Sequence, residues 1–462
     1  MKLERFVVPG LAHYSYVVAS QDKAAVVDPR RDVDVYQDYA AANGLKITHI
    51  LETHIHADYA SGARELAART GAKLWLSGHD TGEDFEYSFP HHEFRDGEEL
   101  MLGGTRIVAL HTPGHTPEHL SFLLYEEGGR KQPMAMLSGD FVFVGSLGRP
   151  DLLGEGAKYK LAGQLYESVH QKIAAMPDGL EIHPAHGAGS MCGAGMGERP
   201  QTTLGYERAT NVFFAPRSQN EFVDLILGSV PPFPEYYKRM KRVNSEGLLL
   251  PELPGGAALS PEEFRKQAED KQAVVIDLRR PEAFGGAHVP GAFSIGGDQN
   301  LAMWAAWMVP YDRPILLVGD EAASYEEARR SLVRVGLDDI RGHLRGGMKS
   351  WILAGYPQEH VAQISVTELA ARNGKGDLYV LDVRSDREWK SGHVAGAMHI
   401  MASDLPQQLD SLPRDRTVHI ICGSGYRSSI ASSVMKRAGR SNVVNMVGGM
   451  TAWTGAGLPT VT

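Results

Sequence analysis

The stretch Thr53-His54-Ile55-His56-Ala57-Asp58-Tyr59 follows an apolar run, residues 47–51, and precedes a helix-like segment, residues 60–68. This order predicts a strand, a short loop and then a helix. The loop carries two imidazoles and a carboxylate, which together suit zinc, iron or manganese, and a short loop between regular elements can hold them rigidly. Further ligands must come from elsewhere in the chain.

Three later polar residues each stand at the end of an apolar, strand-like run. They are His115 in Gly114-His115-Thr116, Asp140 in Gly139-Asp140 and His186 in His186-Gly187. A lone histidine or aspartate at a strand end is most often an ordinary polar residue, so none of them identifies a metal site by itself. The full set in this order, HxHxD followed by Gly-His-Thr, Gly-Asp and His-Gly, is far more specific.

Over residues 1–250, this ordered set resembles the metallo-β-lactamase superfamily. The resemblance implies an α/β fold, an αββα sandwich of two mixed sheets flanked by helices, with the metal between the sheet ends. Short β-like runs alternate with helical patterns such as residues 161–175 and 210–227, which suits this architecture. Residues 231–234 break the helical pattern and residues 251–256 are typical of a linker, so we expect the first domain to span residues 1–250.

The rest of the chain contains an internal repeat. Asp277-Leu278-Arg279 corresponds to Asp382-Val383-Arg384, and Gly346-Gly347-Met348 corresponds to Gly448-Gly449-Met450. Each copy also has a Gly-His-x-x-Gly-Ala-like turn and a tryptophan after its last glycines. These features resemble rhodanese domains, which we expect at residues 257–358 and 363–462.

In the second copy, an apolar strand ends at Cys422 and a small loop leads into a helix. The backbone N–H groups of such a loop bind an anion and favour a thiolate over a thiol. We predict that Cys422 is a nucleophile that holds a terminal sulfur as a persulfide. Arg427 adds positive charge as a second catalytic residue, and the loop residues are predicted to bind substrate: Gly423, Ser424, Gly425 and Tyr426.

Two alternatives to this interpretation are a buried structural cysteine and phosphate chemistry. Tyrosine phosphatases use C-x5-R loops, whereas Arg427 is the fifth residue after Cys422, and the shorter loop favours sulfur transfer. The first copy has Val318 in place of the cysteine, followed by Asp320 and Glu321. A valine cannot attack and carboxylates repel an anionic substrate, so this copy is expected to be an inactive spacer or docking module.

The first domain allows two kinds of metal chemistry. Zinc hydrolysis is the commonest function of the superfamily, and binuclear hydrolases of the glyoxalase II type have a histidine after the aspartate of the motif. This chain has Tyr59 there, and a neutral phenol is a poor replacement. A mononuclear site remains, with the two histidines and one carboxylate typical of non-haem Fe(II) oxygenases.

The whole chain resembles the three-domain persulfide dioxygenase-sulfurtransferases of bacterial sulfide detoxification. This resemblance implies Fe(II) bound by His54, His115 and Asp140. It places His56, Asp58 and His186 around these ligands or as remnants of a second metal site. The implied reaction oxidises a low-molecular-weight thiol persulfide with O2 to sulfite, and Cys422 then gives thiosulfate. The alternatives are a zinc-dependent glyoxalase II-like thioester hydrolase fused to a sulfurtransferase, and a sulfur-carrying scaffold without catalysis.

Two further residues are candidates on weaker grounds. Gly148-Arg149-Pro150-Asp151 matches a family segment whose arginine lies near the substrate, although Arg149 can equally brace its loop through Asp151. Cys192 lies in the glycine-rich loop 187–197. It either carries a persulfide toward the metal or is a small residue within that loop.

The composition describes a soluble globular protein of about three domains, with 462 residues, 43% hydrophobic and 22% charged. A net charge of −9 gives no electrostatic footprint for nucleic acid or an anionic membrane. Two cysteines exclude a disulfide framework and fit a reducing compartment. Residues 1–5 lack an apolar signal region, and we predict a cytoplasmic protein. The family resemblance implies a homo-oligomer; which thiol carries the sulfur is left open.

Overall fold

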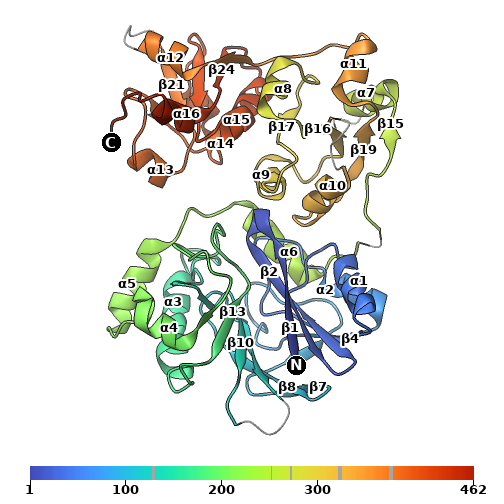
Figure 1. Ribbon diagram of the computed structural model, residues 1–462, viewed down its shortest axis with the longest axis vertical. Helices are drawn as coiled ribbons and strands as arrows, with labels where there is room; N and C mark the ends of the chain where they lie inside the picture. The colour runs from blue at the N-terminus through green and yellow to red at the C-terminus, as the bar shows by residue number, and fades with distance from the viewer. Residues whose placement is uncertain (127–130, 251, 271–272, 321–324, 374–377) are drawn as a thin grey trace. The chain divides into compact units, whose positions relative to one another are not determined.

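The computed structural model describes residues 1–126, 131–250, 252–270, 273–320, 325–373 and 378–462 (Figure 1). The chain divides into two compact units. Unit 1 contains Met1–Glu252 with Val333–Gly336, and unit 2 contains Leu253–Leu332 with Leu337–Thr462. Glu321 of the inactive copy lies outside the described residues. Within the described residues, every helix is too short or too polar to cross a lipid bilayer.

Two six-stranded sheets form the middle of unit 1. The first contains, in spatial order, β1 (Lys2–Val8), β2 (His13–Ser20), β3 (Lys23–Val27), β4 (Lys46–Leu51), β5 (Lys73–Ser77) and β6 (His92–Phe94). The second contains β14 (Thr202–Thr203), β13 (Glu181–Pro184), β10 (Ala135–Gly139), β9 (Leu120–Tyr125), β8 (Thr105–His111) and β7 (Glu99–Leu102). Both sheets are mixed, because β3 to β6 run parallel and only β10 and β13 pair in parallel in the second.

Helices cover the outer faces of both sheets. α1 (Asp34–Ala42) and α2 (Ala63–Thr70) share a core with the first sheet, and α3 (Lys158–Glu167) and α5 (Gln219–Ser229) share one with the second. A third core, with Val27 and Leu51 from one sheet and Phe122 and Leu137 from the other, lies between the sheets. The expected αββα sandwich is therefore confirmed.

Local boundaries differ from the sequence pattern in three places. The helix expected at residues 60–68 begins only at Ala63, because Gly62 is its N-cap and donates its backbone N–H to the Pro29 carbonyl, at 2.9 Å. The helical pattern at 161–175 becomes a π-helical turn at Ser168–Lys172. The helical pattern at 210–227 is divided among the end of α4 (Leu204–Thr210), a 3₁₀ turn and α5. A further helix, α6 (Tyr236–Glu246), was not predicted from the sequence.

Unit 2 contains two parallel five-stranded sheets of matching topology. The strands of the first copy are, in spatial order, β15 (Ala258–Leu259), β19 (Ile340–Leu344), β18 (Ile315–Val318), β16 (Val274–Asp277) and β17 (Phe293–Ser294). Those of the second copy are, in the same order, β20 (Ala362–Ile364), β24 (Val443–Met446), β23 (Val418–Ile421), β21 (Tyr379–Asp382) and β22 (Met398–His399). The helices of the first copy are α7 (Pro261–Asp270), α8 (Pro281–Gly286), α9 (Leu301–Met308), α10 (Tyr325–Val333) and α11 (Gly347–Leu353). Those of the second are α12 (Val366–Asn373), α13 (Asp386–Lys390), α14 (Leu405–Gln408), α15 (Tyr426–Arg437) and α16 (Gly449–Gly455).

The repeat extends to individual contacts. Asp277 and Arg279 form a buried ion pair at 2.6 Å, and Asp382 and Arg384 form the equivalent pair at 2.7 Å. In each copy the tryptophan after the glycines donates its indole N–H to a proline carbonyl six residues later. The two copies are thus built on one framework, and several of the motifs recognised in the sequence make equivalent contacts in both.

Candidate metal centre and thiol site

His54 lies directly after β4, in the loop between β4 and α2. Its Nδ1 is 2.9 Å from the hydroxyl of Thr53, and that hydroxyl donates to Asp28 Oδ2 at 2.9 Å. Because the hydroxyl proton is directed to Asp28, Nδ1 of His54 is the donor to Thr53. The lone pair of His54 then lies on Nε2, where it can bind a metal.

The other two predicted ligands are oriented in the same way. His115 follows β8, and its Nδ1 donates to the Arg149 carbonyl at 3.0 Å, which leaves Nε2 as the acceptor. Asp140 follows β10, and its Oδ1 accepts from His186 Nδ1 at 2.6 Å. The backbone N–H of Asp140 donates to His119 Nε2 at 3.0 Å. Each residue therefore has one atom fixed by a neighbour and one that remains available.

The available atoms of the ligand triad, His54, His115 and Asp140, converge. They lie within 4.8 Å of one another, and Asp140 Oδ2 is 3.8 Å from His54 Nε2 and 3.4 Å from His115 Nε2. All three are buried and have no hydrogen-bond partner among the described residues. Burial lowers the pKa of both histidines well below the usual value, which favours the neutral form that binds metals. The triad therefore fits a metal ion, and its donor set suits iron or zinc.

A second group lies against the triad and contains Asp58, His186 and Cys192. Their ligand atoms also lie within 4.8 Å of one another. His186 Nε2 is 2.7 Å from Asp58 Oδ2, while Cys192 Sγ is 3.8 Å from the Tyr237 hydroxyl. Burial, followed by the nearby aspartates, raises the pKa of the Cys192 thiol well above its usual value. The structure thus places Cys192 beside the metal centre, and its proposed role as a sulfur carrier stays a prediction.

His56 and Tyr59 both contact Asp28. His56 Nε2 is 3.2 Å from Asp28 Oδ1, and the Tyr59 hydroxyl donates to the Asp28 carbonyl at 3.2 Å. Tyr59 also packs on His13, with ring centroids 4.0 Å apart. Asp28 therefore organises the HxHxD loop. The sequence analysis missed Asp28, although it follows the apolar run of β3 and so carried the same strand-end signal as the ligands.

Arg149 is fully engaged with its own surroundings. Its guanidinium forms a bidentate ion pair with Asp151, at 2.7 and 2.8 Å, and donates to the carbonyls of Met191, Pro231 and Pro232. It is 1% exposed. This arrangement is the one expected if Arg149 braces its own loop through Asp151. Contact between Arg149 and a substrate stays a prediction.

Two glycines let the loops approach closely at the metal centre. Gly139 has a φ of +54°, and a Cβ there would meet His119 Nε2 at 2.5 Å. A Cβ on Gly148 would lie 1.9 Å from the Asp140 carbonyl and 3.0 Å from the His115 side chain. Any larger residue at Gly148 would displace two members of the triad.

The second candidate site is the loop after β23. Cys422 is buried, and its sulfur accepts the backbone N–H of Gly425 at 3.1 Å and lies 3.4 Å from the Ser428 hydroxyl. The helix α15 begins directly after this loop. The structure therefore brings the predicted nucleophile and the start of α15 together, as an anion-stabilising loop requires.

Arg427 does not present a free charge to this loop. Its guanidinium forms a bidentate ion pair with Glu388 on α13, with both distances 2.6 Å. Glu388 was not singled out in the sequence.

The first copy corrects one expectation: Val318 pairs with Asp277 as Ile421 pairs with Asp382, so Gly319, and not Val318, stands where Cys422 lies in the second copy. The expected absence of a thiol from that position holds, because glycine has no side chain. A cavity of about 450 Å³ within unit 2 is lined by Ser424 and Tyr426 together with residues of the first copy, including Arg280.

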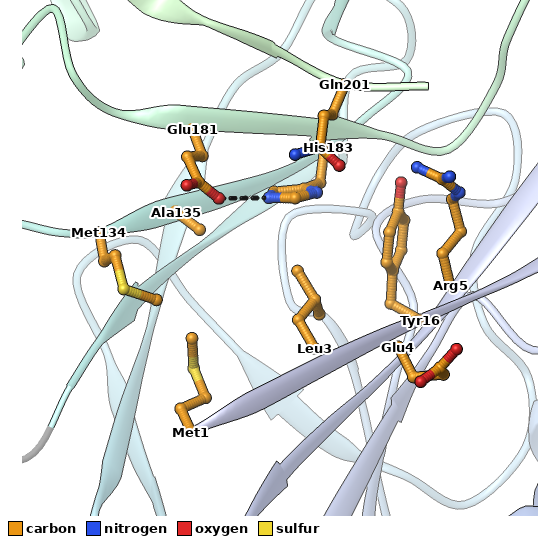
Figure 2. A pocket seen from close by; sticks show the side chains of 10 residues that line it. All are labelled: Met1, Leu3, Glu4, Arg5, Tyr16, Met134, Ala135, Glu181, His183 and Gln201. Atoms are coloured by element: carbon orange, nitrogen blue, oxygen red, sulfur yellow. Dashed lines mark hydrogen bonds and ion pairs between the residues drawn. The ribbon is translucent and has the colours of Figure 1, made fainter. Parts of the chain in front are cut away.

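A separate cavity of about 430 Å³ lies at one edge of unit 1. Figure 2 shows that its lining side chains come from β1 and β2 on one side and from around β10 and β13 on the other. Glu181 and His183 form its ion pair, at 3.1 Å. Neither member of this pair belongs to the triad, and no triad residue lines the cavity. It is therefore distinct from the metal centre.

Comparisons with known families agree with the two-unit architecture. The model of the metallo-beta-lactamase superfamily matches residues 8–186, and the model of the rhodanese-like domain matches residues 260–354 and 365–456. Among curated proteins, the hydroxyacylglutathione hydrolase of Francisella tularensis subsp. novicida strain U112 is 30% identical over 188 residues. These are 40% of this chain and 68% of that protein.

Two solved structures are similar. A metallo-beta-lactamase from Staphylococcus aureus subsp. aureus COL is 36% identical with a TM-score of 0.67, covering 75% of this chain and 99% of its own. Because unit 1 is little more than half of the chain, this match extends into unit 2. ETHE1 from Myxococcus xanthus is 24% identical with a TM-score of 0.44, covering 53% and 98%. That likeness is too distant to bear on function.

Proposed function

Because this chain belongs to the metallo-β-lactamase superfamily and continues into two rhodanese-like domains, we propose that it oxidises a thiol persulfide in unit 1 and transfers sulfur in unit 2. A low-molecular-weight thiol persulfide, O2 and water would give the free thiol, sulfite and two protons. Cys422, carrying a sulfur from a second persulfide, would pass it to sulfite. The S–S bond of the cysteine persulfide breaks, an S–S bond forms in thiosulfate, and Cys422 is left as a thiolate.

The observation that carries this proposal is the ligand triad. Two histidines and one carboxylate supply three buried, convergent donor atoms, and this composition is typical of non-haem Fe(II) oxygenases. When bound there, ferrous iron would supply the activation of O2. Tyr59, which stands where binuclear hydrolases of the glyoxalase II type have a histidine, donates its hydroxyl to the Asp28 carbonyl, and this supports a mononuclear rather than a binuclear centre. The Cys422 loop supports the proposed sulfur transfer in unit 2, because the backbone N–H of Gly425 donates to the Cys422 sulfur.

A zinc-dependent thioester hydrolase is the second candidate. It is favoured by the 30% identity to proteins named hydroxyacylglutathione hydrolase. In that case the triad would hold zinc, and the rhodanese-like domains would serve a separate reaction. The two candidates differ in their need for O2.

The test is O2 uptake by Fe(II)-loaded protein after addition of glutathione persulfide or coenzyme A persulfide, with sulfite and thiosulfate measured afterwards. We expect rapid uptake that ends in thiosulfate. The variant Cys422→Ser should keep the uptake and the sulfite but form no thiosulfate. Loss of uptake in that variant would contradict the division between the two sites. Absence of uptake in the wild type, with tight zinc binding and thioesterase activity, would replace the proposal with the hydrolase.

A further inference from the structure

A cavity of unit 2 lies between the two rhodanese-like copies. Its volume of about 450 Å³ falls within the range of about 300–1,000 Å³ that is usual for pockets that bind small organic molecules. Ser424 and Tyr426 line it, and they belong to the loop that follows Cys422 and to the start of α15. All its other lining residues belong to the inactive copy. The cavity therefore connects the candidate sulfur-transfer loop with a domain that contains no cysteine.

The inactive copy lines this cavity with the edge of its sheet where ligands usually bind. Residues 278–282 follow β16 and residues 296–298 follow β17, so both segments lie beyond the carboxyl ends of parallel strands. In open α/β sheets, ligands bind at this edge. In the second copy, Cys422 stands at the same edge, directly after β23. The inactive copy thus lacks the thiol but still presents the edge at which a ligand is expected.

Direct contacts join the inactive copy to α15 beside the cavity. Tyr426 donates its hydroxyl to the Gly296 carbonyl at 3.2 Å, and a Cβ on Gly296 would lie 3.0 Å from the Tyr426 ring. The hydroxyls of Ser294 and Ser429 are 2.7 Å apart. These contacts fix the start of α15, and with it the Cys422 loop, against the segment after β17. The cavity is therefore bounded by two elements that touch each other.

The charged side chains that line the cavity are of both signs. Arg279 is engaged in the buried ion pair with Asp277. Arg280 forms an ion pair with Glu282 at 3.6 Å, and this pair is exposed and so contributes little. A guanidinium carries several N–H donors, so this contact leaves donors for a carboxylate of a ligand. Glu282 and Asp298 add negative charge. This combination suits a ligand that has both a carboxylate and an ammonium group.

We propose that this cavity binds the carrier part of the sulfur donor of Cys422, and that Arg280 of the inactive copy binds a carboxylate of that carrier. The carrier is then an amino-acid-type thiol, whose ammonium group meets Glu282 and Asp298. A carrier with several phosphates would be repelled by these two carboxylates. The identification of the ligand as a sulfur donor rests on the function proposed above, whereas the binding of such a thiol does not.

The sulfur transfer that the cavity would serve is a thiol exchange. The Cys422 thiolate attacks the outer sulfur of the donor R–S–SH, the S–S bond of the donor breaks, and the carrier leaves as the thiolate R–S⁻. Cys422 is left as the persulfide Cys–S–SH, and no oxidant or reductant is consumed. Ser424 of the cavity lining is two residues from Cys422, so a carrier in the cavity lies beside the nucleophile's loop. The competing interpretation is that the cavity only results from the packing of two domains.

Calorimetric titration of the full chain with S-methylglutathione tests the binding by itself. This probe has the carboxylates and the ammonium group of glutathione but no sulfur to transfer. We expect Arg280→Gln to bind it about tenfold or more weakly than the wild type, and Arg280→Lys to lie between them. Arg341→Gln is the matched control, because Arg341 is an exposed, ion-paired arginine of the same copy that does not line the cavity. Binding of the probe in unit 1 would be common to all these variants.

Affinity within about twofold of the wild type in Arg280→Gln would overturn the proposal. Tighter binding of desulfo-coenzyme A than of S-methylglutathione would overturn the class of carrier, because the first probe carries phosphates.

A second experiment measures thiosulfate formed from glutathione persulfide and added sulfite without O2, so that no oxidation in unit 1 takes part. In Arg280→Gln the KM for glutathione persulfide should rise about tenfold or more, with kcat within about twofold of the wild type. Transfer that is unchanged in this variant would contradict the inference and leave the proposed function intact. Absence of thiosulfate in the wild type would contradict the proposed sulfur transfer, and with it the identification of the ligand as a donor.

Discussion

Asp28 links three parts of the HxHxD loop through one carboxylate. It accepts the backbone N–H and the hydroxyl of Thr53, at 2.7 and 2.9 Å, and faces His56 at 3.2 Å. Its φ of +52° belongs to the left-handed region, which asparagine and aspartate tolerate better than other side chains. Through Thr53, this carboxylate fixes which nitrogen of His54 is free for a metal.

We therefore predict that Asp28→Asn lowers metal affinity by about 10- to 100-fold. An asparagine keeps the backbone conformation but cannot accept from Thr53 at both oxygens, so the ring of His54 loses its orientation. Competition with a chelator, followed by metal analysis, measures the effect. Asp22→Asn, in the exposed turn between β2 and β3, is the control. Equal affinities in the wild type and Asp28→Asn would mean that Asp28 does not orient the ligand.

At this scale, the sequence indicated the three converging residues of the triad better than the residues that support them. Each ligand follows an apolar run, β4 in the first sheet and β8 and β10 in the second, so the strand-end positions already indicated a shared site. Supporting residues have no such order. Lys241 contacts Ile55 across 186 positions of sequence, and only the packing of α6 brings them together.

Between elements, the ion pair of Arg427 and Glu388 joins the start of α15 to α13. Burial alone would raise the pKa of Glu388, but hydrogen bonds from Arg427 and Ser385 lower it to about 2. The ordinary value for an unfolded glutamate is about 4.3. Because the pKa is lower in the folded state, the ion pair stabilises the fold fully above about pH 4.3 and loses this effect as the pH falls toward 2.

The lowered pKa of Glu388 gives a prediction for the stability of the variant Glu388→Gln. Near pH 6 the variant should unfold at a lower urea concentration than the wild type, and the gap should shrink as the pH falls from about 5 to about 2. The carboxylate is partly exposed, so we expect a modest gap. Urea unfolding at several pH values measures it. Glu262→Gln, on the exposed surface of α7, should show no comparable gap. A gap that stays constant with pH would exclude the ion pair as its origin.

The elements themselves were predicted unevenly. Strands β4, β8 and β23 coincide with clear apolar runs in the sequence, and the internal repeat shows the rhodanese-like framework twice. The sequence therefore predicted these strands and the two repeated domains. α6 was missed because Lys241 and Asn244 interrupt the apolar positions of its buried face, which are Tyr237, Met240 and Val243. These two polar side chains donate to backbone carbonyls of the HxHxD loop, and their role could be seen only once the fold was known.

At the scale of the whole molecule, one chain carries two candidate reaction sites, which would share an intermediate under the proposed function. Sulfite made in unit 1 would be the acceptor for the sulfur carried by Cys422 in unit 2. Covalent linkage raises the effective concentration of one site around the other, so less intermediate escapes when both sites are on one chain.

Two variants of the whole chain can test this coupling. Asp140→Asn lacks the carboxylate of the triad, and Cys422→Ser lacks the thiol proposed to transfer sulfur. Mixed after purification, they contain both sites but on different molecules. At low protein concentration we expect the mixture to release more free sulfite than the same number of wild-type sites. The excess should shrink as the protein concentration rises, because encounters between molecules then replace linkage. Equal sulfite release at every concentration would mean that sulfite diffuses freely between the sites, and that the fusion has no channelling effect.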